Sequence, residues 1–555
     1  MASTPPGAEQ PTMSNKRPAT TSLLEGKADK EDSLDRPISS SQDENEKPQP
    51  KSLKFKLTVF FLALVTVVGS MDAVIVGSAL AAIAQDLQSS SVESFWVGTS
   101  FLLSQTVTIP LYGTTSEIFG RKWPILIAIS IFLLGSILCA TAQTITWLIG
   151  ARVVQGIGAG GMIQLVQVIL SDISTMSERG LYMAIAAFAW SLGTNIGIPI
   201  GGAIGERTTW RWIFYINIPV CVICIVGLLY ALQLQHDTSS FVKKLGMLDW
   251  AGLGVFTCAS TLFLVGLTSG GCFASVGFGR CPGSWRVSKR PMMPLRIFND
   301  RSAIVGFVTS FLHGLVFWCL TYYMIVFFLG ALQHSVLHAS LETMTCIAYS
   351  APAGLVASML VKRTQHFKYI IVVGWALLAA GMGTNITMHP DSSKAMLYGP
   401  RVLISLGGGL LFPTPIFAVQ ARQHGDDIGI ATSIQVFTRS MGTAFGVGLG
   451  GVIFQNQWSK EVDSAVTAGR IPHDLIVGSN VAETAYEVIR KFPEAVQEAY
   501  RGDSLATMWY VMMGLSIAGF VVSLVGRNDV ISGGLTGKQN FKDEKKGDLE
   551  GGRSG

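Results

Sequence analysis

Residues 149–219 decide how this chain folds, and they begin with IGARVVQGIGAGGM at 149–162. Arg152 stands in this otherwise apolar stretch. An arginine at the centre of a membrane helix costs roughly 2.5–3.5 kcal/mol, so it needs a partner or water. In the next apolar stretch, glycines recur every four residues from Gly193 to Gly205, and this spacing lets membrane helices approach closely. The region predicts a tightly packed helical bundle around a polar pathway, an arrangement typical of transporters.

The composition is that of a polytopic membrane protein. Hydrophobic residues make up 49% and charged residues 14% of the 555 residues, whereas soluble domains average about 25% charged residues. The charges gather in the tails and loops, so the net charge of +5 does not indicate a nucleic-acid partner. The eight cysteines have neither disulfide nor zinc spacing, and Cys221 and Cys224 fall in an apolar stretch without further ligands. We therefore expect no metal site.

Thirteen apolar segments are long enough to cross a bilayer, which takes about 20 residues. They lie near 58–80, 96–115, 124–143, 147–171, 181–205, 212–233, 249–269, 303–328, 338–361, 368–388, 396–420, 429–453 and 504–526. The predicted parts of the chain are a disordered cytosolic tail (1–56), a six-helix half (57–235), a central linker with one extra helix (236–302), a second six-helix half with an outer loop at 457–503 (303–526), and a disordered cytosolic tail (527–555).

Lysines and arginines gather in alternate loops, and the positive-inside rule places those loops and both termini in the cytosol. The segment 249–269 breaks this alternation, because Lys243 and Lys244 precede it and Arg286 and Lys289 follow it. The residues between 270 and 286 are too few and too polar for a return helix. Two interpretations stay open: the segment 249–269 does not cross, or a helix after it is missing.

Five short motifs follow one another along the chain. The first contains an acid within MDAVIVGSAL (71–80), and the last is the aromatic string WRWIFYINIP (210–219). Between them come a charged loop, a helix with arginine and glycine, and a glycine-rich helix. The residues that define them are Asp72; Gly113, Glu117, Gly120, Arg121 and Lys122; Arg152, Gln155, Gly156 and Gly158; Gly193, Gly197, Pro199, Gly201 and Gly202; and Trp210, Arg211, Trp212, Asn217 and Pro219.

In these motifs and their order, residues 55–530 resemble the major facilitator superfamily, and within it the fourteen-span drug:proton antiporter branch of fungal toxin and multidrug efflux pumps. The resemblance implies an all-α polytopic membrane protein with two pseudo-symmetric six-helix halves, one central extra helix and a substrate cavity between the halves. The branch has a further span after 249–269 that this chain lacks. The chain also departs from the family at Glu117, where Asp is usual, and at Pro199, which is displaced by one residue.

The resemblance implies that Asp72, Arg152 and Arg439 serve proton coupling and transport. At a rise of 1.5 Å per residue, Asp72 lies about 22 Å above the start of its span and Arg152 about 7–8 Å below the outer end of its own. Both fall in the outer half of the bilayer, where we expect them to approach one another or to share a proton path. Two alternatives stay open: Arg152 snorkels to the headgroups, or Asp72 is a hydrogen-bonded packing residue. Arg439 lies deeper and is expected to be paired.

The other motifs have implied roles as well. The charged loop, with Gly113 and Gly120 around Glu117, is expected to be a gating latch, although plain positive-inside topology also explains Arg121 and Lys122. The glycine-rich helix resembles an antiporter motif, and the aromatic string is the family junction. We interpret His313 as a packing residue. Asn385 begins an Asn-Ile-Thr sequon, the predicted glycosylation site.

The sequence has no P-loop, Ser/His/Asp triad or HExxH pair, so we expect neither enzymatic activity nor ATP as the energy source. The resemblance implies a monomeric plasma-membrane secondary transporter without cofactors. It would export small apolar organic compounds, such as secondary metabolites, toxins or drugs, in exchange for protons. The alternatives are uptake of a metabolite or siderophore, and a non-transporting or decayed membrane protein, because one helix of the family is absent.

Overall fold

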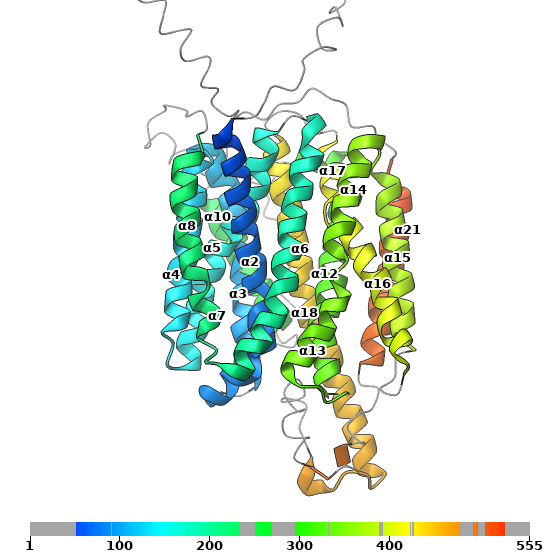
Figure 1. The fold of residues 1–555 in the computed structure, drawn as a ribbon. Helices are drawn as coiled ribbons and strands as arrows, with labels where there is room; N and C mark the ends of the chain where they lie inside the picture. Colours follow the sequence, from blue (N-terminus) through cyan, green and yellow to red (C-terminus); the bar gives the residue numbers. More distant parts are fainter. Residues whose placement is uncertain are drawn as a thin grey trace, which may run out of the picture. The chain divides into compact units, whose positions relative to one another are not determined.

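The computed structural model describes residues 52–527 except 90, 175, 234–249, 269–294, 331, 388–391, 422, 424–426, 477–491, 494–495 and 498–504. The predictions for the two tails, for the missing helix after 269 and for much of the outer loop fall largely outside these residues. The described chain is predominantly helical, and Figure 1 shows its helices running roughly alongside one another. We call the end at which α2 begins the inner end, and the opposite end the outer end.

The N-terminal half has six consecutive helical segments. They are α2 (Leu53–Asp86), α3 (Ser91–Phe119), α4 (Lys122–Ala140), α5 (Ile145–Ile173), α6 (Met176–Arg207), and the short α7 (Trp212–Tyr215) with α8 (Asn217–Ala231). The first packs along the fifth, the second and third pack on the fourth, and the third also packs on the sixth.

The C-terminal half has six segments too. They are α12 (Arg301–Gly330); α13 (Val336–Thr343), η2 (Met344–Cys346) and α14 (Ser350–Thr364); α15 (Lys368–Asn385); α16 (Lys394–Leu411) and α17 (Thr414–Gln420); α18 (Asp427–Thr467); and α21 (Ala506–Val525). Two short turns, η1 (Leu295–Asn299) and η3 (His473–Leu475), flank this half. Its first segment packs along the fifth, the second and third pack on the fourth, and the third packs on the sixth. This repeats the N-terminal pattern, as pseudo-symmetric halves require.

Glycines set the close approach of the helices in the N-terminal half. Gly193 and Gly201 of α6 lie so close to α2 that a side chain there would overlap the carbonyl oxygens of Val67 and Ile75. Gly158 of α5 faces α4 in the same way, and Gly156 faces α3. Backbone contact of this kind packs helices tightly where lipid is as apolar as the side chains.

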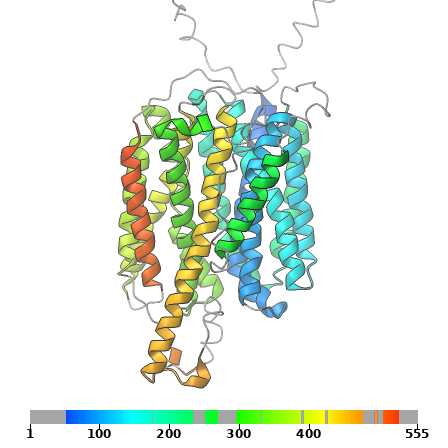
Figure 2. The same cartoon turned by 180° about the vertical axis from the view of Figure 1, so that it is seen from behind.

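The segment 249–269 forms α10 (Trp250–Thr268), which packs on α3 of one half and α18 of the other. Phe256 of α10 meets Phe437 of α18 edge to face, with ring centroids 5.1 Å apart. Figure 2 shows α10 slanting beside α18. The extra helix therefore lies over the seam between the two halves.

Nine helices in the described part are long and apolar enough to cross a membrane. The remaining four predicted segments contain α3, α10, α15 and α18. Large apolar side chains such as Val226 of α8 and Val521 of α21 are exposed around the periphery of the bundle, which suits contact with lipid. The predicted fold class is confirmed. In both views α18 extends past the other helices at the outer end.

Candidate functional site

Asp72 of α2 and Arg152 of α5 form a buried ion pair. Arg152 Nη1 lies 2.6 Å from Asp72 Oδ2, and the two side chains are 1% and 0% exposed. Gln155 and Asn217 both donate to the other carboxylate oxygen, Asp72 Oδ1, at 2.9 and 2.7 Å. The carboxylate thus ties α2 to α5 and α8. The structure brings Asp72 and Arg152 together as predicted, and Arg152 turns inward instead of snorkelling.

Further contacts fix the Arg152 guanidinium. Its Nε donates to the Val97 carbonyl oxygen at 3.2 Å, and its Cζ lies 4.0 Å from the centroid of the Phe101 ring. Gln155 is held in turn by a hydrogen bond from its Nε2 to Ser136 Oγ at 2.9 Å. The aromatic contact and the hydrogen bonds compensate the guanidinium for lost water. Gln155 and Asn217 belong to two of the sequence motifs, but their contact with Asp72 was not predicted.

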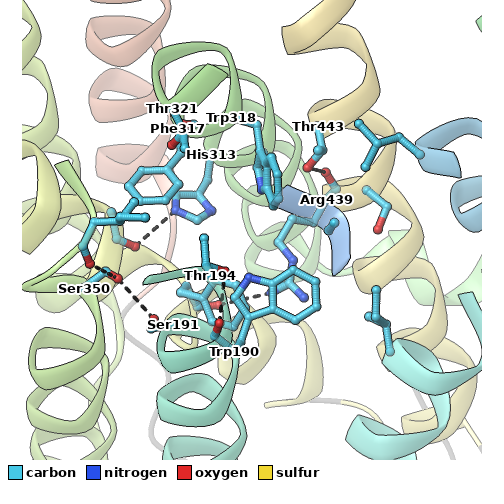
Figure 3. A pocket seen from close by; sticks show the side chains of 18 of the residues that line it. Trp190, Ser191, Thr194, His313, Phe317, Trp318, Thr321, Ser350, Arg439 and Thr443 are labelled. Atoms are coloured by element: carbon cyan, nitrogen blue, oxygen red, sulfur yellow. Dashed lines mark hydrogen bonds between the residues drawn. The ribbon is translucent and has the colours of Figure 1, made fainter. Parts of the chain in front are cut away.

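A cavity of about 40 Å³ lies between the two halves. Its wall comes from α2, α3, α5 and α6 on one side and from the helices of the C-terminal half on the other. Figure 3 labels ten of the residues that line it: Trp190, Ser191, Thr194, His313, Phe317, Trp318, Thr321, Ser350, Arg439 and Thr443. Ala73 lines it, next in sequence to Asp72. This space holds a few water molecules, whereas sites for organic ligands measure about 300–1,000 Å³. The helices must separate before an organic compound can enter.

Two stacked aromatic rings form part of the inner wall of this central cavity. Trp190 of α6 and Phe412, between α16 and α17, have ring centroids 5.8 Å apart and an interplanar angle of 30°. A second cavity of about 30 Å³ shares Trp190 and Phe412 with the first, and its wall includes Thr66 and Met183, closer to the inner ends of their helices. The ring stack therefore separates the two cavities. Neither ring belongs to a motif that the sequence reveals.

Arg439 of α18 lines both cavities. Its Cζ lies 4.3 Å from the centroid of the Phe412 ring, and its Nη1 donates to the Phe412 carbonyl oxygen at 3.4 Å. Among the described residues, no carboxylate forms an ion pair with it. The expectation of a charged partner for Arg439 is therefore not met in the described part of the chain. His313, interpreted as a packing residue, also lines the central cavity.

The predicted gating latch lies at the inner end. Arg121 donates through Nε to Asp172 Oδ2 at 2.9 Å and through Nη1 to Ser116 Oγ at 2.7 Å. Lys122 donates to the Leu229 carbonyl oxygen at 2.9 Å on the surface. Asp172, at the end of α5, was not among the predicted latch residues, although an acid at the inner end of an apolar span is the signal that marks it.

The latch meets the C-terminal half at α18. A side chain on Gly429 would touch Glu117 Oε1 and Arg121 Nη2, and one on Gly113 would overlap Ser433. Ser433 also accepts a hydrogen bond from Gln164. Gly120 has a φ of +84°, which only glycine adopts without strain, and so ends α3 before α4 begins. The latch residues thus lie against the first turns of α18 and help to close the inner end.

The glycine-rich helix α6 closes the outer half of the seam. Its Gly193, Gly197 and Gly201 face α2, and Gly202 faces Ser340 of α13. Asn195 Nδ2 donates to the Ile347 carbonyl oxygen at 3.2 Å, and Glu206 Oε1 accepts from the Leu337 backbone at 2.7 Å. Pro199 lies within α6. The two halves thus contact one another near the outer end through α6, and near the inner end through the latch residues.

The family junction lies at the outer end of α2. Trp210 Nε1 and Arg211 Nη1 both donate to Asp86 Oδ2, at 2.8 and 2.9 Å. These hydrogen bonds, with the charge of Arg211, hold the pKa of the Asp86 carboxyl below its usual value. Trp212 is exposed at the periphery, which suits an interfacial aromatic residue. Pro219 lies in the first turn of α8.

The position of Asn385 does not fit the predicted glycosylation site. Its side chain is 1% exposed at the end of α15. An oligosaccharide on Nδ2 needs a surface side chain, and here the amide is enclosed by the bundle. Among the described residues, no group of three or more His, Cys, Asp or Glu side chains could hold a metal ion.

Comparison with known proteins shows the family. Residues 62–458 match the Major Facilitator Superfamily. The MFS transporter L2 of a Phoma species is 30% identical over 87% of this chain and 85% of its own. The MFS-type efflux pump LUC4 of a Fusarium species is 28% identical over 87% and 89%.

The fold also resembles a solved structure. A bacterial homolog of the human lysosomal transporter Spinster, in an inward-facing and unoccupied conformation, aligns over 87% of this chain and all of its own, with a TM-score of 0.54 and 13% identity. That likeness concerns the fold alone, but it agrees with the family match and with the repeated packing of the two halves. This multi-pass membrane protein belongs to the major facilitator superfamily.

Proposed function

We propose that this chain exports small, mostly apolar organic compounds in exchange for protons. The single observation that carries the proposal is the position of the Asp72–Arg152 ion pair, one residue from Ala73 in the wall of the central cavity. Similar chains are named efflux pumps in a Fusarium species and in Mycosarcoma maydis, and an efflux transporter in Aspergillus oryzae. Their names support the direction of transport.

The ion pair offers a physical mechanism for coupling. In this structure Asp72 holds α2 against α5 and α8 through Arg152, Gln155 and Asn217. A proton on the carboxylate removes the charge that balances Arg152 and weakens these contacts. The α2 helix, which carries Ala73 of the cavity wall, then moves relative to α5. Proton binding on one side and release on the other would thereby alternate access to the cavity.

The proton gradient would be the energy source, without ATP or a cofactor. A membrane potential adds about 2.3 kcal/mol for each elementary charge moved through 100 mV. We further propose that the protein acts as a monomer in the plasma membrane, with both termini in the cytosol and no enzymatic activity. The inner end of the bundle would then face the cytosol, in agreement with the lysines and arginines of its loops.

The proposal is tested with the full-length chain in proteoliposomes of defined orientation. The probes are three dyes of different charge: neutral Nile red, cationic rhodamine 6G and anionic fluorescein. We expect an imposed pH gradient to drive at least one dye outward through the wild type. Asp72→Asn and Arg152→Ala should abolish this proton-driven flux at equal protein content.

Two controls separate coupling from stability. Asp86→Asn removes a half-exposed ion pair at the outer end and should keep most of the flux. The double variant Asp72→Asn/Arg152→Gln leaves no unpaired charge and should fold well, yet it should still lack proton-driven flux. Undiminished flux in both single variants would contradict the assignment of coupling to this pair.

A further inference from the structure

Arg439 and His313 lie at the same depth in the bundle. Arg439 is twelve residues after Asp427, the first residue of α18, and His313 is twelve residues after Arg301, the first residue of α12. At 1.5 Å per residue, each lies about 18 Å along its helix. A bilayer has a hydrocarbon core about 30 Å thick, so both groups lie near its centre. The central cavity is at this depth, and both side chains line it (Figure 3).

Arg439 has different surroundings from Arg152 and Arg121, two other buried arginines. Arg152 and Arg121 each lie within 3 Å of a carboxylate, at 2.6 and 2.9 Å. Arg439 meets only the ring and the carbonyl oxygen of Phe412, with no carboxylate partner in the described part of the chain. A guanidinium has five N–H donors in a planar fork, so most of its donors remain for a ligand. The cavity thus carries a positive charge that the described residues do not neutralise.

The groups around this charge fit an amphipathic ligand. Trp190, Phe317 and Trp318 offer aromatic faces, and Thr194 and Ser350 offer hydroxyl groups. His313 has its Nε2 at the Gly408 carbonyl oxygen, 3.1 Å away, and its Nδ1 has no partner among the described residues. The wall therefore combines one cation with a largely apolar, aromatic surface. A neutral apolar compound would leave the guanidinium unpaired on binding, whereas an anion would neutralise it.

We propose that the central cavity binds acidic organic compounds, with the acidic group paired to Arg439 and an apolar, aromatic body packed against Trp190 and Phe317. This assignment rests on the proposed export function and names its substrate class. A carboxylate matches the guanidinium fork with two parallel hydrogen bonds. The low dielectric of the bundle centre strengthens the pairing relative to water. An enolate or sulfonate group would satisfy the same charge with a different geometry.

The test measures binding, and it needs no transport. The full-length protein in lipid nanodiscs is titrated with three matched pairs by calorimetry at a pH near neutrality. The pairs are 1-naphthoate and 1-naphthamide, 4-biphenylcarboxylate and 4-biphenylcarboxamide, and 9-anthracenecarboxylate and 9-anthracenecarboxamide. We expect the carboxylate of at least one pair to bind about tenfold tighter than its amide, which is about 1.4 kcal/mol.

Variants of Arg439 connect the preference to this residue. Arg439→Gln should bring the carboxylate and the amide within about twofold of one another, and Arg439→Lys should retain part of the preference because it keeps the charge. Lys460→Gln, an exposed change farther along α18, should leave the preference intact. Arg439→Lys also keeps the test possible if Arg439→Gln does not fold.

The outcomes separate this inference from the proposed function. Equal binding within every pair, no binding of any carboxylate, or an unchanged preference in Arg439→Gln would overturn the anion site. A strong carboxylate preference in protein that shows no proton-driven flux would support the anion site and contradict the proposed coupling to protons. Carboxylate preference together with proton-driven flux of fluorescein supports both.

Discussion

Trp190 of α6 stacks on Phe412 of the opposite half, and the two rings separate the central cavity from the smaller cavity on its inner side. Arg439 also packs on the Phe412 ring, with its Cζ 4.3 Å from the Phe412 centroid. Phe412 directly precedes Pro413, where α16 gives way to α17. The ring thus sits at a break in the helix, a place where a small backbone change moves the side chain.

We expect Trp190→Ala to join the two cavities and to uncouple transport. Loss of the indole removes the wall between them, so dye should cross proteoliposomes without a pH gradient, at a rate several-fold above the wild type. Trp190→Phe keeps a ring that stacks on Phe412 and should retain coupled flux. Equal gradient-independent flux in wild type and Trp190→Ala would contradict a gate at this position.

The buried ion pair should also contribute to stability. Removing one partner of a buried pair typically costs about 3–5 kcal/mol, because the other charge is left unpaired. We expect Arg152→Gln and Asp72→Asn each to lower the thermal midpoint of the detergent-solubilised protein. The double variant Asp72→Asn/Arg152→Gln should recover part of the loss. Strictly additive losses would show that the pair is not energetically coupled.

Glycine packing between α2 and α6 yields a separate stability prediction. A methyl group at Gly193 would overlap the Val67 carbonyl oxygen and Ser70 Oγ. Gly193→Ala should therefore destabilise the protein by about 1–3 kcal/mol, as overpacking does. Gly150→Ala, in α5 with open space around it, is the matched control. It should be neutral or stabilising by up to about 1 kcal/mol, since alanine favours helix. Similar thermal midpoints for both variants would argue against the close approach.

The Asp86 carboxylate at the outer end should make a pH-dependent contribution to the stability of the folded protein. Hydrogen bonds from Trp210 and Arg211 lower the pKa of the Asp86 carboxyl below its usual value of 3.8. A carboxyl with a lowered pKa in the folded state stabilises that state above its unfolded pKa and loses this contribution as the pH falls through the folded pKa. The thermal midpoint of the wild type should thus exceed that of Asp86→Asn at about pH 7, by a small margin because the pair is half exposed.

The difference in thermal midpoint between the wild type and Asp86→Asn should shrink as the pH falls below 3.8, and it should disappear under more acidic conditions. High salt should reduce it at every pH, because ions screen exposed charges. Thermal unfolding of both proteins along a pH series measures the effect. A difference that persists in acid would rule out the Asp86 carboxylate as its source.

The sequence predicted the fold and the central ion pair because their signals are local. Apolar length identified the spans, and the rise per residue placed Asp72 and Arg152 at similar depths before any contact was known. Their approach required only that α2 and α5 belong to one half. A buried acid and a buried arginine inside apolar helices have few other ways to compensate their charges.

The Trp190–Phe412 ring stack and the lack of a carboxylate partner for Arg439 among the described residues could not be predicted in this way. Trp190 and Phe412 are ordinary aromatic residues in apolar stretches of the sequence, and their contact depends on how the two halves meet. Arg439 was expected to be paired on the general rule for buried charges, and the structure instead gives it an aromatic neighbour and a cavity. The surface position assumed for Asn385 failed for a similar reason, because burial at a helix end depends on neighbouring helices.

Proton movement tests the central claim most directly. Proteoliposomes with the full chain are loaded with the pH dye pyranine and given an outward gradient of fluorescein, with no pH gradient and with the membrane potential clamped. We predict that fluorescein leaving through the wild type draws protons in and acidifies the lumen, while Asp72→Asn leaves the lumen pH unchanged. Fluorescein efflux through the wild type without a change in lumen pH would contradict proton exchange.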